Sequence, residues 1–395
     1  MERIILHFRP YTQAPDPDRI DVLDGVRALC VFLVGWYHIW QQGWLTPSFM
    51  LGNRVISLDP LLRSGYLWVD GMLLLSGFLL YLPYTEGKKN PAVLPFYKRR
   101  LIRILPSYLL CILPLFVLSC AQGAYATAGD AAKDLLAHLT FTHTLFPFSY
   151  HNTPLNGALW TLGVEMQFYL LFPFLARAFK RRPAVTWAAM AGAAFLFRAY
   201  AGRQGDVSMY FNQLPAFLDV YANGFAAASV YAALRKKLGS GEWDRKIRLF
   251  FTVAFLLCAC QLMAIAQAQA ASNGYDVIRQ GQMDRRFPFS VALSAAMVSA
   301  ACSLPALRFL LGNRVMHFLS AISFQFYIYH QMLAVKLKEW NIPYSAYDAP
   351  QVDDPAWRLP YTLLCFLLAI ALAAVITYAF ERPVARALRR KLNAR

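Results

Sequence analysis

The sequence predicts an all-α membrane protein, a polytopic bundle of about ten transmembrane helices with both termini in the cytoplasm. Hydrophobic residues make up 58% of the 395 positions and charged residues 15%, which is not the composition of an ordinary soluble domain. Apolar windows of about 20 residues, enough to cross a hydrocarbon core about 30 Å thick, recur along almost the whole chain. Lys and Arg gather at the ends of these windows. We therefore expect a single transmembrane domain over residues 1–395, with no appended soluble domain.

The expected crossings are 22–42, 66–85, 101–121, 157–178, 184–202, 210–234, 248–270, 287–308, 315–337 and 359–381. The stretch before the first crossing lacks the basic-then-apolar pattern of a cleaved signal peptide, so the first crossing is expected to remain as a helix. The loop 122–156 contains AAKDLLAHLTFTHTLF, which we expect to form a helix on the outer surface. His138, His143 and His151 in this loop are interpreted as ordinary surface or interface residues.

The positions of the basic residues predict the orientation of the chain. With a cytoplasmic N-terminus, the segments assigned to the inside carry 27 Lys and Arg residues, the outside loops carry 11, and Arg27 lies within the first span. The positive-inside rule then places both termini in the cytoplasm. Clusters such as Lys88-Lys89 are expected to contact anionic lipid headgroups.

Two classes of ligand are not expected. The net charge of +17 is concentrated at the ends of membrane helices, so it indicates membrane topology and no nucleic-acid partner. The seven cysteines fall in apolar stretches without the spacing of metal ligands, and we expect them to be buried and unpaired. No metal site is predicted.

Four ionisable residues within the expected spans predict a polar site in the outer half of the membrane. They are His38, Asp70, Glu165 and His330, each from a different span. A rise of about 1.5 Å per residue places all four in one layer. Hydrogen bonding to a neighbouring helix is the alternative for each one alone, but four together favour a site. A histidine beside a carboxylate in a low-dielectric cavity can act as a general base.

A second, cationic layer is expected near the cytoplasmic face. Arg27 precedes His38 by eleven residues, about three helical turns, so both side chains face the same side of one helix. Arg100 and Arg103 lie three residues apart at the mouth of the third span, and Arg382 ends the last span. Guanidinium groups suit phosphate, so the two layers predict a long ligand with a phosphorylated head in the cytoplasm.

These residues occur in six motifs. In chain order the motifs are the Arg-x10-His of Arg27 and His38 after Leu23-Asp24-Gly25, VDGMLLLSGF, the Arg-x2-Arg of Arg100 and Arg103 leading into ILPSY, LWTLGVEMQFYLLFP, FYIYHQ and the closing FERP. Together they resemble the acyltransferase-three family of integral-membrane, acyl-CoA-dependent O-acyltransferases, and the resemblance runs over nearly the whole chain. VDGMLL stands where a VDLFF-like run is expected, and LGVE where LSVE is commoner, so side-chain roles at those departures are not carried over.

The resemblance implies a membrane enzyme that takes acyl-CoA as its co-substrate, with no bound cofactor. It would pass acetyl, or succinyl or another short acyl group, to a hydroxyl of a glycan or a lipid-linked sugar, from a bacterial inner membrane. His38 would be the catalytic base, with Glu165 or Asp70 supporting it, and Arg27, Arg100 and Arg103 would bind acyl-CoA. Supporting positions are His330, Tyr327, Trp160 and Arg382. Direct transfer and an acyl-enzyme intermediate both remain open.

Two other functions are compatible with polar residues in membrane spans. A secondary transporter or flippase for an anionic or glycolipid substrate also has charges at mid-membrane, although no pair of related halves is visible in this sequence. In a non-catalytic scaffold or sensor, the buried His and Glu would only bond neighbouring helices.

Overall fold

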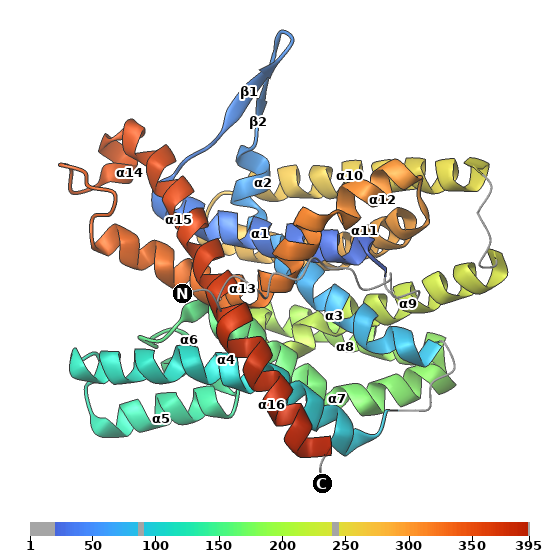
Figure 1. The fold of residues 1–395 in the computed structure, drawn as a ribbon, viewed down its shortest axis with the longest axis horizontal. Coiled ribbons are helices and arrows are strands. Elements are labelled where there is room, and N and C mark those ends of the chain that lie inside the picture. The colour runs from blue at the N-terminus through green and yellow to red at the C-terminus, as the bar shows by residue number, and fades with distance from the viewer. Residues whose placement is uncertain (1–19, 86–90, 239–244, 394–395) are drawn as a thin grey trace, which may run out of the picture.

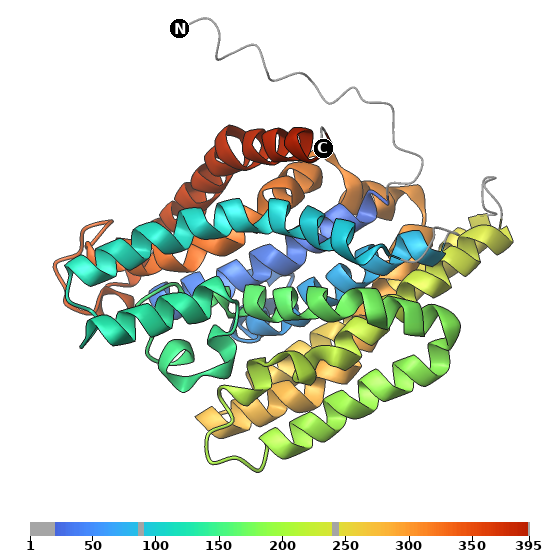
Figure 2. The ribbon, with the colours of Figure 1, turned by 90° about the horizontal axis from the view of Figure 1, so that it is seen from below.

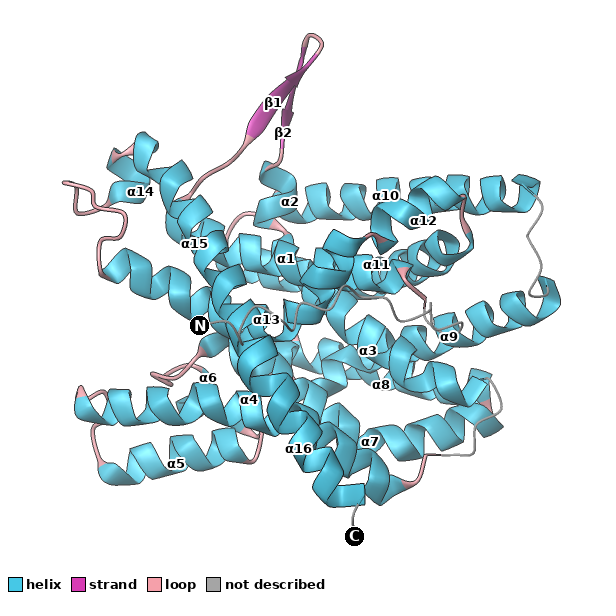
Figure 3. Cartoon of the chain, viewed as in Figure 1, coloured by secondary structure: helices cyan, strands magenta, loops and turns pink. Residues whose placement is uncertain are grey.

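The computed structural model describes residues 20–85, 91–238 and 245–393, and these residues form a helical bundle with one small β-hairpin (Figures 1 and 3). Each of the ten expected spans overlaps a long helix. These helices are α1 Val22–Gly43, α3 Trp68–Thr85, α4 Val93–Ala121, α7 Trp160–Arg181, α8 Pro183–Ala201, α9 Leu218–Leu238, α10 Arg245–Ala270, α11 Tyr275–Cys302, α13 Arg314–Glu339 and α15 Pro355–Val375. The predicted all-α membrane bundle is confirmed.

Within the described ranges, eight helical segments are long and apolar enough to cross a membrane, or nine if the bent pair α11 and α12 (Pro305–Gly312) counts as one span. The expected continuous span 287–308 is wrong, because the chain bends by 113° between these two helices. Leu304 is extended and precedes Pro305, and a residue before proline is disfavoured in helical conformation. The helix α13 is not among the eight, yet it packs against α1 and α15 along the bundle.

The connections carry the shorter elements. They are β1 Ser48–Leu51, β2 Arg54–Ser57, α2 Asp59–Arg63, α5 Ala128–Leu139, α6 Pro147–Tyr150, α14 Pro350–Asp353, a π-helical segment Ile376–Glu381 and α16 Arg382–Asn393. The antiparallel hairpin was not predicted and stands away from the bundle (Figure 1). Its signal is the Gly52-Asn53 turn between two apolar runs. Lys88 and Lys89 lie outside the described residues.

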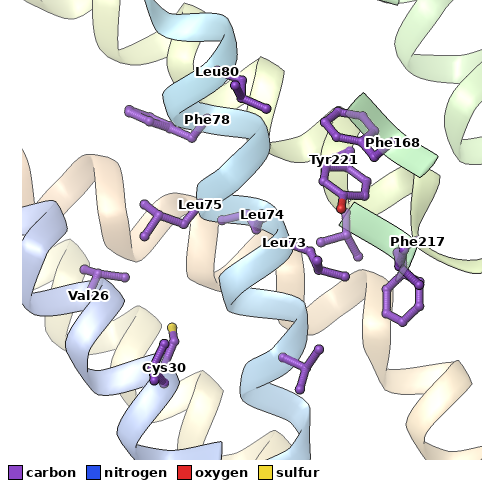
Figure 4. Close-up of a cluster of buried hydrophobic side chains, with 14 of the residues drawn as sticks. Val26, Cys30, Leu73, Leu74, Leu75, Phe78, Leu80, Phe168, Phe217 and Tyr221 are labelled. Carbon is purple, nitrogen blue, oxygen red and sulfur yellow. The ribbon is translucent and has the colours of Figure 1, made fainter. Parts of the chain in front are cut away.

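The bundle has a buried centre and an exposed periphery. More than half of the apolar stretch is buried in each of the central helices, α1, α3, α7 and α9. Less than a third of it is buried in each of the peripheral helices, α4, α8, α10 and α15. Figure 2 shows the same long helices from a perpendicular direction. At the centre, Leu73–Leu75 and Phe78 of α3 lie near Phe168 and Tyr221, whose rings stack with centroids 3.5 Å apart (Figure 4).

Glycines set the closest helix contacts in this centre. A Cβ atom added at Gly224 of α9 would lie 2.5 Å from the carbonyl oxygen of Leu74 on α3. A Cβ atom at Gly35 of α1 would lie 2.4 Å from the ring of Phe326 on α13. Small residues let membrane helices approach closely, so these positions fix α1 and α3 against their neighbours.

The segment 122–156 contains the expected helix, α5, and two of its histidines are buried. His138 and His143 are 1% and 3% exposed, so of the two settings expected for them they occupy the interface and not the surface. Their rings stack with centroids 4.5 Å apart. Hydrogen bonds attach this segment to the bundle. Tyr108 of α4 donates to the carbonyl of His138, and the ring of His143 lies 3.2 Å from the carbonyl oxygen of Leu159. His151 remains partly exposed.

The cysteines follow the prediction only in part. All seven are unpaired. Cys30, Cys111, Cys302 and Cys365 are buried, Cys258 is half-buried, and Cys120 and Cys260 are exposed. The last two lie on α4 and α10, which face outward, so their expected burial is wrong.

The α3–α9 contact can be tested with Gly224→Leu. Because its side chain would meet the α3 backbone, we expect a loss of stability of about 1–3 kcal/mol or more. Thermal unfolding of the detergent-purified protein measures this loss. Gly192→Leu on α8 is the matched control, since a Cβ atom there meets nothing within 4 Å. Equal stability of the two variants would contradict the close approach.

The buried His143 predicts sensitivity to acid. Burial, together with the neighbouring His138, lowers the pKa of His143 to about 3. In the unfolded chain His143 takes up a proton near its ordinary pKa of about 6.5, whereas in the folded chain it stays neutral down to about pH 3. The free energy of unfolding therefore falls as the pH drops from about 6.5 toward 3. His143→Gln should reduce this slope, by up to about 1.4 kcal/mol per pH unit. Unfolding midpoints between pH 7 and pH 4 measure it, and identical slopes would exclude this role.

Candidate functional site

A cavity of about 190 Å³ lies between α1, α3, α4, α7 and α13. Its polar lining consists of Arg27, Ser76, Arg100, Arg103, Thr161, Glu165, Tyr169, Ser323 and Tyr327, and its remaining lining is apolar. The structure thus brings the three predicted arginines together around one space. Arg103 is exposed at this cavity, while Arg27 and Arg100 are half-buried.

The cavity contains an excess of positive charge. Arg27 lies within electrostatic range of both Arg103 and Glu165. Among the described residues that line the cavity, Glu165 is the one carboxylate against three guanidinium groups. Arg100 has a buried Nε that lacks a hydrogen-bond partner in the described part of the chain. Such a site attracts an anion.

The carboxylate of Glu165 is held by neighbours within the cavity. The hydroxyl of Ser76 on α3 donates to its Oε1 at 2.9 Å, and the hydroxyl of Tyr169 donates to the same oxygen. Arg100 in turn lies 5.4 Å from the centre of the Tyr169 ring. Tyr169 was not predicted as a site residue. It follows Glu165 by four residues, so the two side chains lie on the same helix face, which is the signal that could have identified it.

A histidine pair joins α1 to α13. The Nδ1 atom of His38 lies 2.8 Å from Nε2 of His330, and Nδ1 of His330 lies 3.0 Å from the carbonyl oxygen of Phe326. A carbonyl only accepts, so Nδ1 of His330 must donate to it. With both rings neutral, Nε2 of His330 then accepts from Nδ1 of His38. This leaves the lone pair of Nε2 on the half-buried His38 available to take a proton.

The histidine pair and the arginine cavity are neighbours along α1. Val31 lines the cavity, and His38 follows it by two turns, about 10 Å, on the same face. Tyr327 also lines the cavity, and its ring centroid lies 5.6 Å from that of His330. His38 is not among the residues that line the cavity, so the arginine cavity and the histidine pair are two adjoining parts of the described structure.

Glu165 lies at the arginine level, and its expected place beside His38 is wrong. The reason is the depth at which α7 begins. Asn156 donates to the carbonyl of Ile328 at 2.5 Å, so α7 begins level with the middle of α13, near His330, and not at the outer boundary. Glu165 follows Asn156 by nine residues and so lies about 13 Å further inward.

Asp70 also has a different partner from the one expected. Its carboxylate lies 3.3 Å from Nε of Arg286, and both side chains are fully buried. A second buried pair, Arg198 and Asp219 at 2.6 Å, lies beside it, since both arginines donate to the carbonyl of Ala216. The imidazole of His38 is therefore held by His330 and not by either carboxylate. The sequence signals that were missed are Arg198 in the apolar run AAFLFRAY and Arg286 at the start of RFPFSV.

Two supporting positions lie apart from the cavity. Trp160 stacks against Phe217 with ring centroids 5.9 Å apart. Arg382 is exposed at the start of α16 and lies 4.4 Å from the centre of the Tyr378 ring. Neither residue lines the arginine cavity.

A helical membrane bundle with a cationic internal cavity and a hydrogen-bonded histidine pair defines a candidate membrane enzyme for an anionic substrate. The model of a family described as an acyltransferase domain matches residues 20–378, and the chain belongs to this family. The predicted family resemblance is thereby confirmed.

Curated relatives carry related names. The chain is 30% identical over 192 residues to the O-acetyltransferase OatA of Staphylococcus aureus, covering 44% of this chain and 28% of that protein. It is 24% identical over 385 residues to the putative peptidoglycan O-acetyltransferase YrhL of Bacillus subtilis, covering 92% and 54%. It is 27% identical over 166 residues to the acyltransferase MdmB of Streptomyces mycarofaciens, covering 42% and 41%. The chain thus spans about half or less of these relatives. No solved structure matches.

Proposed function

We propose that this chain transfers an acyl group, acetyl in the first place, from acyl-CoA to a hydroxyl of a glycan or lipid-linked sugar. Membership of the acyltransferase family and the names of the relatives as O-acetyltransferases support this proposal. The observation that carries it is the hydrogen-bonded chain from Phe326 through His330 to His38, which leaves one imidazole nitrogen ready to accept a proton.

The arginine cavity is the proposed donor site. Acyl-CoA is strongly anionic, and three guanidinium groups against one carboxylate leave two positive charges in excess. The volume of about 190 Å³ is below the ~300–1,000 Å³ of ordinary ligand pockets, so the cavity holds only part of the donor. The exposed Arg103 would meet phosphate at the mouth, and the pantetheine arm would extend past Tyr327 toward His38.

His38 acts as the base in the proposed reaction. Its Nε2 takes the proton of the acceptor hydroxyl as that oxygen bonds to the thioester carbon. The carbon–sulfur bond then breaks, and the CoA thiolate leaves and recovers the proton from the imidazolium. We propose direct transfer, because Ser76 donates its hydroxyl to Glu165 in the arginine cavity and is not paired with the histidines.

The proposed location is a bacterial inner membrane with both termini in the cytoplasm. The bias of Lys and Arg toward the inside segments supports this orientation. It places the arginine cavity toward the cytoplasm, where acyl-CoA is made, and His38 toward the outer face. The acceptor sugar would then be modified near the outer surface.

The base role is tested with His38→Ala and His330→Gln in membranes that retain the folded protein. His38→Ala should lower kcat by roughly 10²–10⁴-fold. His330→Gln should cause a smaller loss, on the order of tenfold to hundredfold, with an altered pH profile and unchanged KM values, because it frees the orientation of the imidazole. Radiolabelled acetyl transfer measures both. Undiminished turnover by His38→Ala would remove this residue from the mechanism.

The donor site is tested with Arg103→Ala. Loss of a charged contact to phosphate should raise the Kd for acetyl-CoA roughly tenfold to hundredfold, with less effect on kcat. Arg99→Ala is the matched control, since Arg99 is exposed on the same helix and does not line the cavity. Calorimetric titration of both purified variants with acetyl-CoA gives the comparison, and equal affinities would rule out phosphate binding by Arg103.

A further inference from the structure

The β1–β2 hairpin exposes apolar side chains at the end of the bundle where α1 ends. It joins α1 to α2, and neither of its strands contains a residue buried against the described part of the chain. More than half of the residue surface is exposed in each of four apolar residues, Phe49, Met50, Leu51 and Val55. The acyl-transfer chemistry proposed above uses none of these side chains. Clustered and exposed apolar residues mark an interaction surface.

The apolar residues lie on both faces of the hairpin. In the antiparallel register, Phe49 is opposite Ile56 and Met50 is opposite Val55. Successive residues of a strand point to opposite faces, so one of these pairs lies on each face. A hairpin that covered a single protein surface would need one apolar face, with polar residues on the face toward water. Apolar pairs on both faces indicate apolar surroundings on both sides.

The hairpin lies beside a surface of the bundle that faces lipid. It leads into α2, which packs against α10. Only 17% of the apolar stretch of α10 is buried within the described structure, as expected for a helix in contact with hydrocarbon. Figure 1 shows the hairpin running across the direction of α10, whereas α14 and the α4–α5 pair extend further along the direction of the long helices. The hairpin therefore extends sideways, into the region that lipid occupies.

Two features place the hairpin at the level of the lipid headgroups. Trp44 lies between α1 and β1 and is 48% exposed, and tryptophan is enriched where membrane and water meet. The sheet has only two strands, so its outer edges carry backbone N–H and C=O groups without strand partners. Such groups are costly in hydrocarbon. At the boundary, headgroups and water satisfy them while apolar side chains reach the acyl chains.

The turn of the hairpin carries a cation suited to this depth. Arg54 is opposite Leu51, next to the turn, and it is exposed. A long basic side chain can bury its methylene groups beside lipid and direct its charged end to the headgroups. The guanidinium group hydrogen-bonds phosphate, the charged group of phospholipids.

From these observations we propose that the hairpin inserts into the membrane leaflet at the end of the bundle where α1 ends and α3 begins. Its exposed apolar side chains contact the parts of the acyl chains nearest the headgroups, and Arg54 contacts lipid phosphate. The lipid bilayer is thus the partner of this surface. The insertion holds the connection between α1 and α3 in the plane of the membrane, and it does not depend on the proposed acyl transfer.

The test attaches an environment-sensitive fluorophore to Met50→Cys. Cys120 and Cys260 are exposed, so both are replaced by serine in every variant, and the protein with these replacements alone gives the background labelling. Each labelled protein is placed as a single copy in a phospholipid nanodisc. Lipids with a nitroxide near the headgroup measure contact with the leaflet, and iodide measures contact with water. Asp348→Cys, in the exposed connection between α13 and α14, carries the control label.

Contact with the leaflet predicts opposite responses at the two positions. Because inserted segments lie ~5–10 Å below the membrane surface, nitroxide lipid should lower the fluorescence of the Met50 label about twofold, and iodide should quench it roughly threefold less than the Asp348 label. Adding Phe49→Asp and Leu51→Asp should reverse both results, since charge opposes insertion. Equal iodide quenching at the two positions would overturn the proposal. A Met50 label shielded from both quenchers would also overturn it and would indicate a protein contact.

Discussion

The constraint on which this structure depends is that a charged side chain inside a membrane bundle needs a partner. Without one, burial costs several kcal/mol. Asp70 meets this need with Arg286, and Arg198 meets it with Asp219, both at full or nearly full burial. The arginine cavity does not balance its charge in the same way. This difference distinguishes the ion-pair cluster, which holds helices together, from the cavity that we propose binds a charged donor.

The same reasoning changes the roles expected for the carboxylates. Asp70 forms a buried ion pair with Arg286, which joins α3 to α11. We therefore assign it a structural role and no part in the chemistry at His38. Glu165 accepts hydroxyl donors from Ser76 and Tyr169 and faces the arginines. In the proposed reaction we therefore assign Glu165 to the donor cavity and not to the base. The support of the imidazole comes from His330, whose own orientation the backbone of Phe326 fixes.

The sequence predicted the membrane helices because apolar length is a local property of the chain. It also predicted that the three arginines belong together, since Arg100 and Arg103 share one helix and Arg27 faces inward. It could not predict the depth of Glu165, because that depth depends on the contact of Asn156 with α13, far away in the chain. The pairing of His38 with His330 likewise depends on which helices are neighbours and how each is rotated.

In the proposed reaction, the distance between the arginines and the base selects the donor by its length. Arg27 and His38 are eleven residues apart on α1, about 16 Å along its axis. A donor with its phosphates at the arginines reaches His38 only if an extended arm connects the phosphates to the acyl group. Acyl-CoA has such an arm, whereas a short acyl phosphate bound at the arginines would leave its carbonyl beside Glu165, far from the base. Under this proposal, the spacing of Arg27 and His38 on α1 favours a donor whose arm spans about 16 Å.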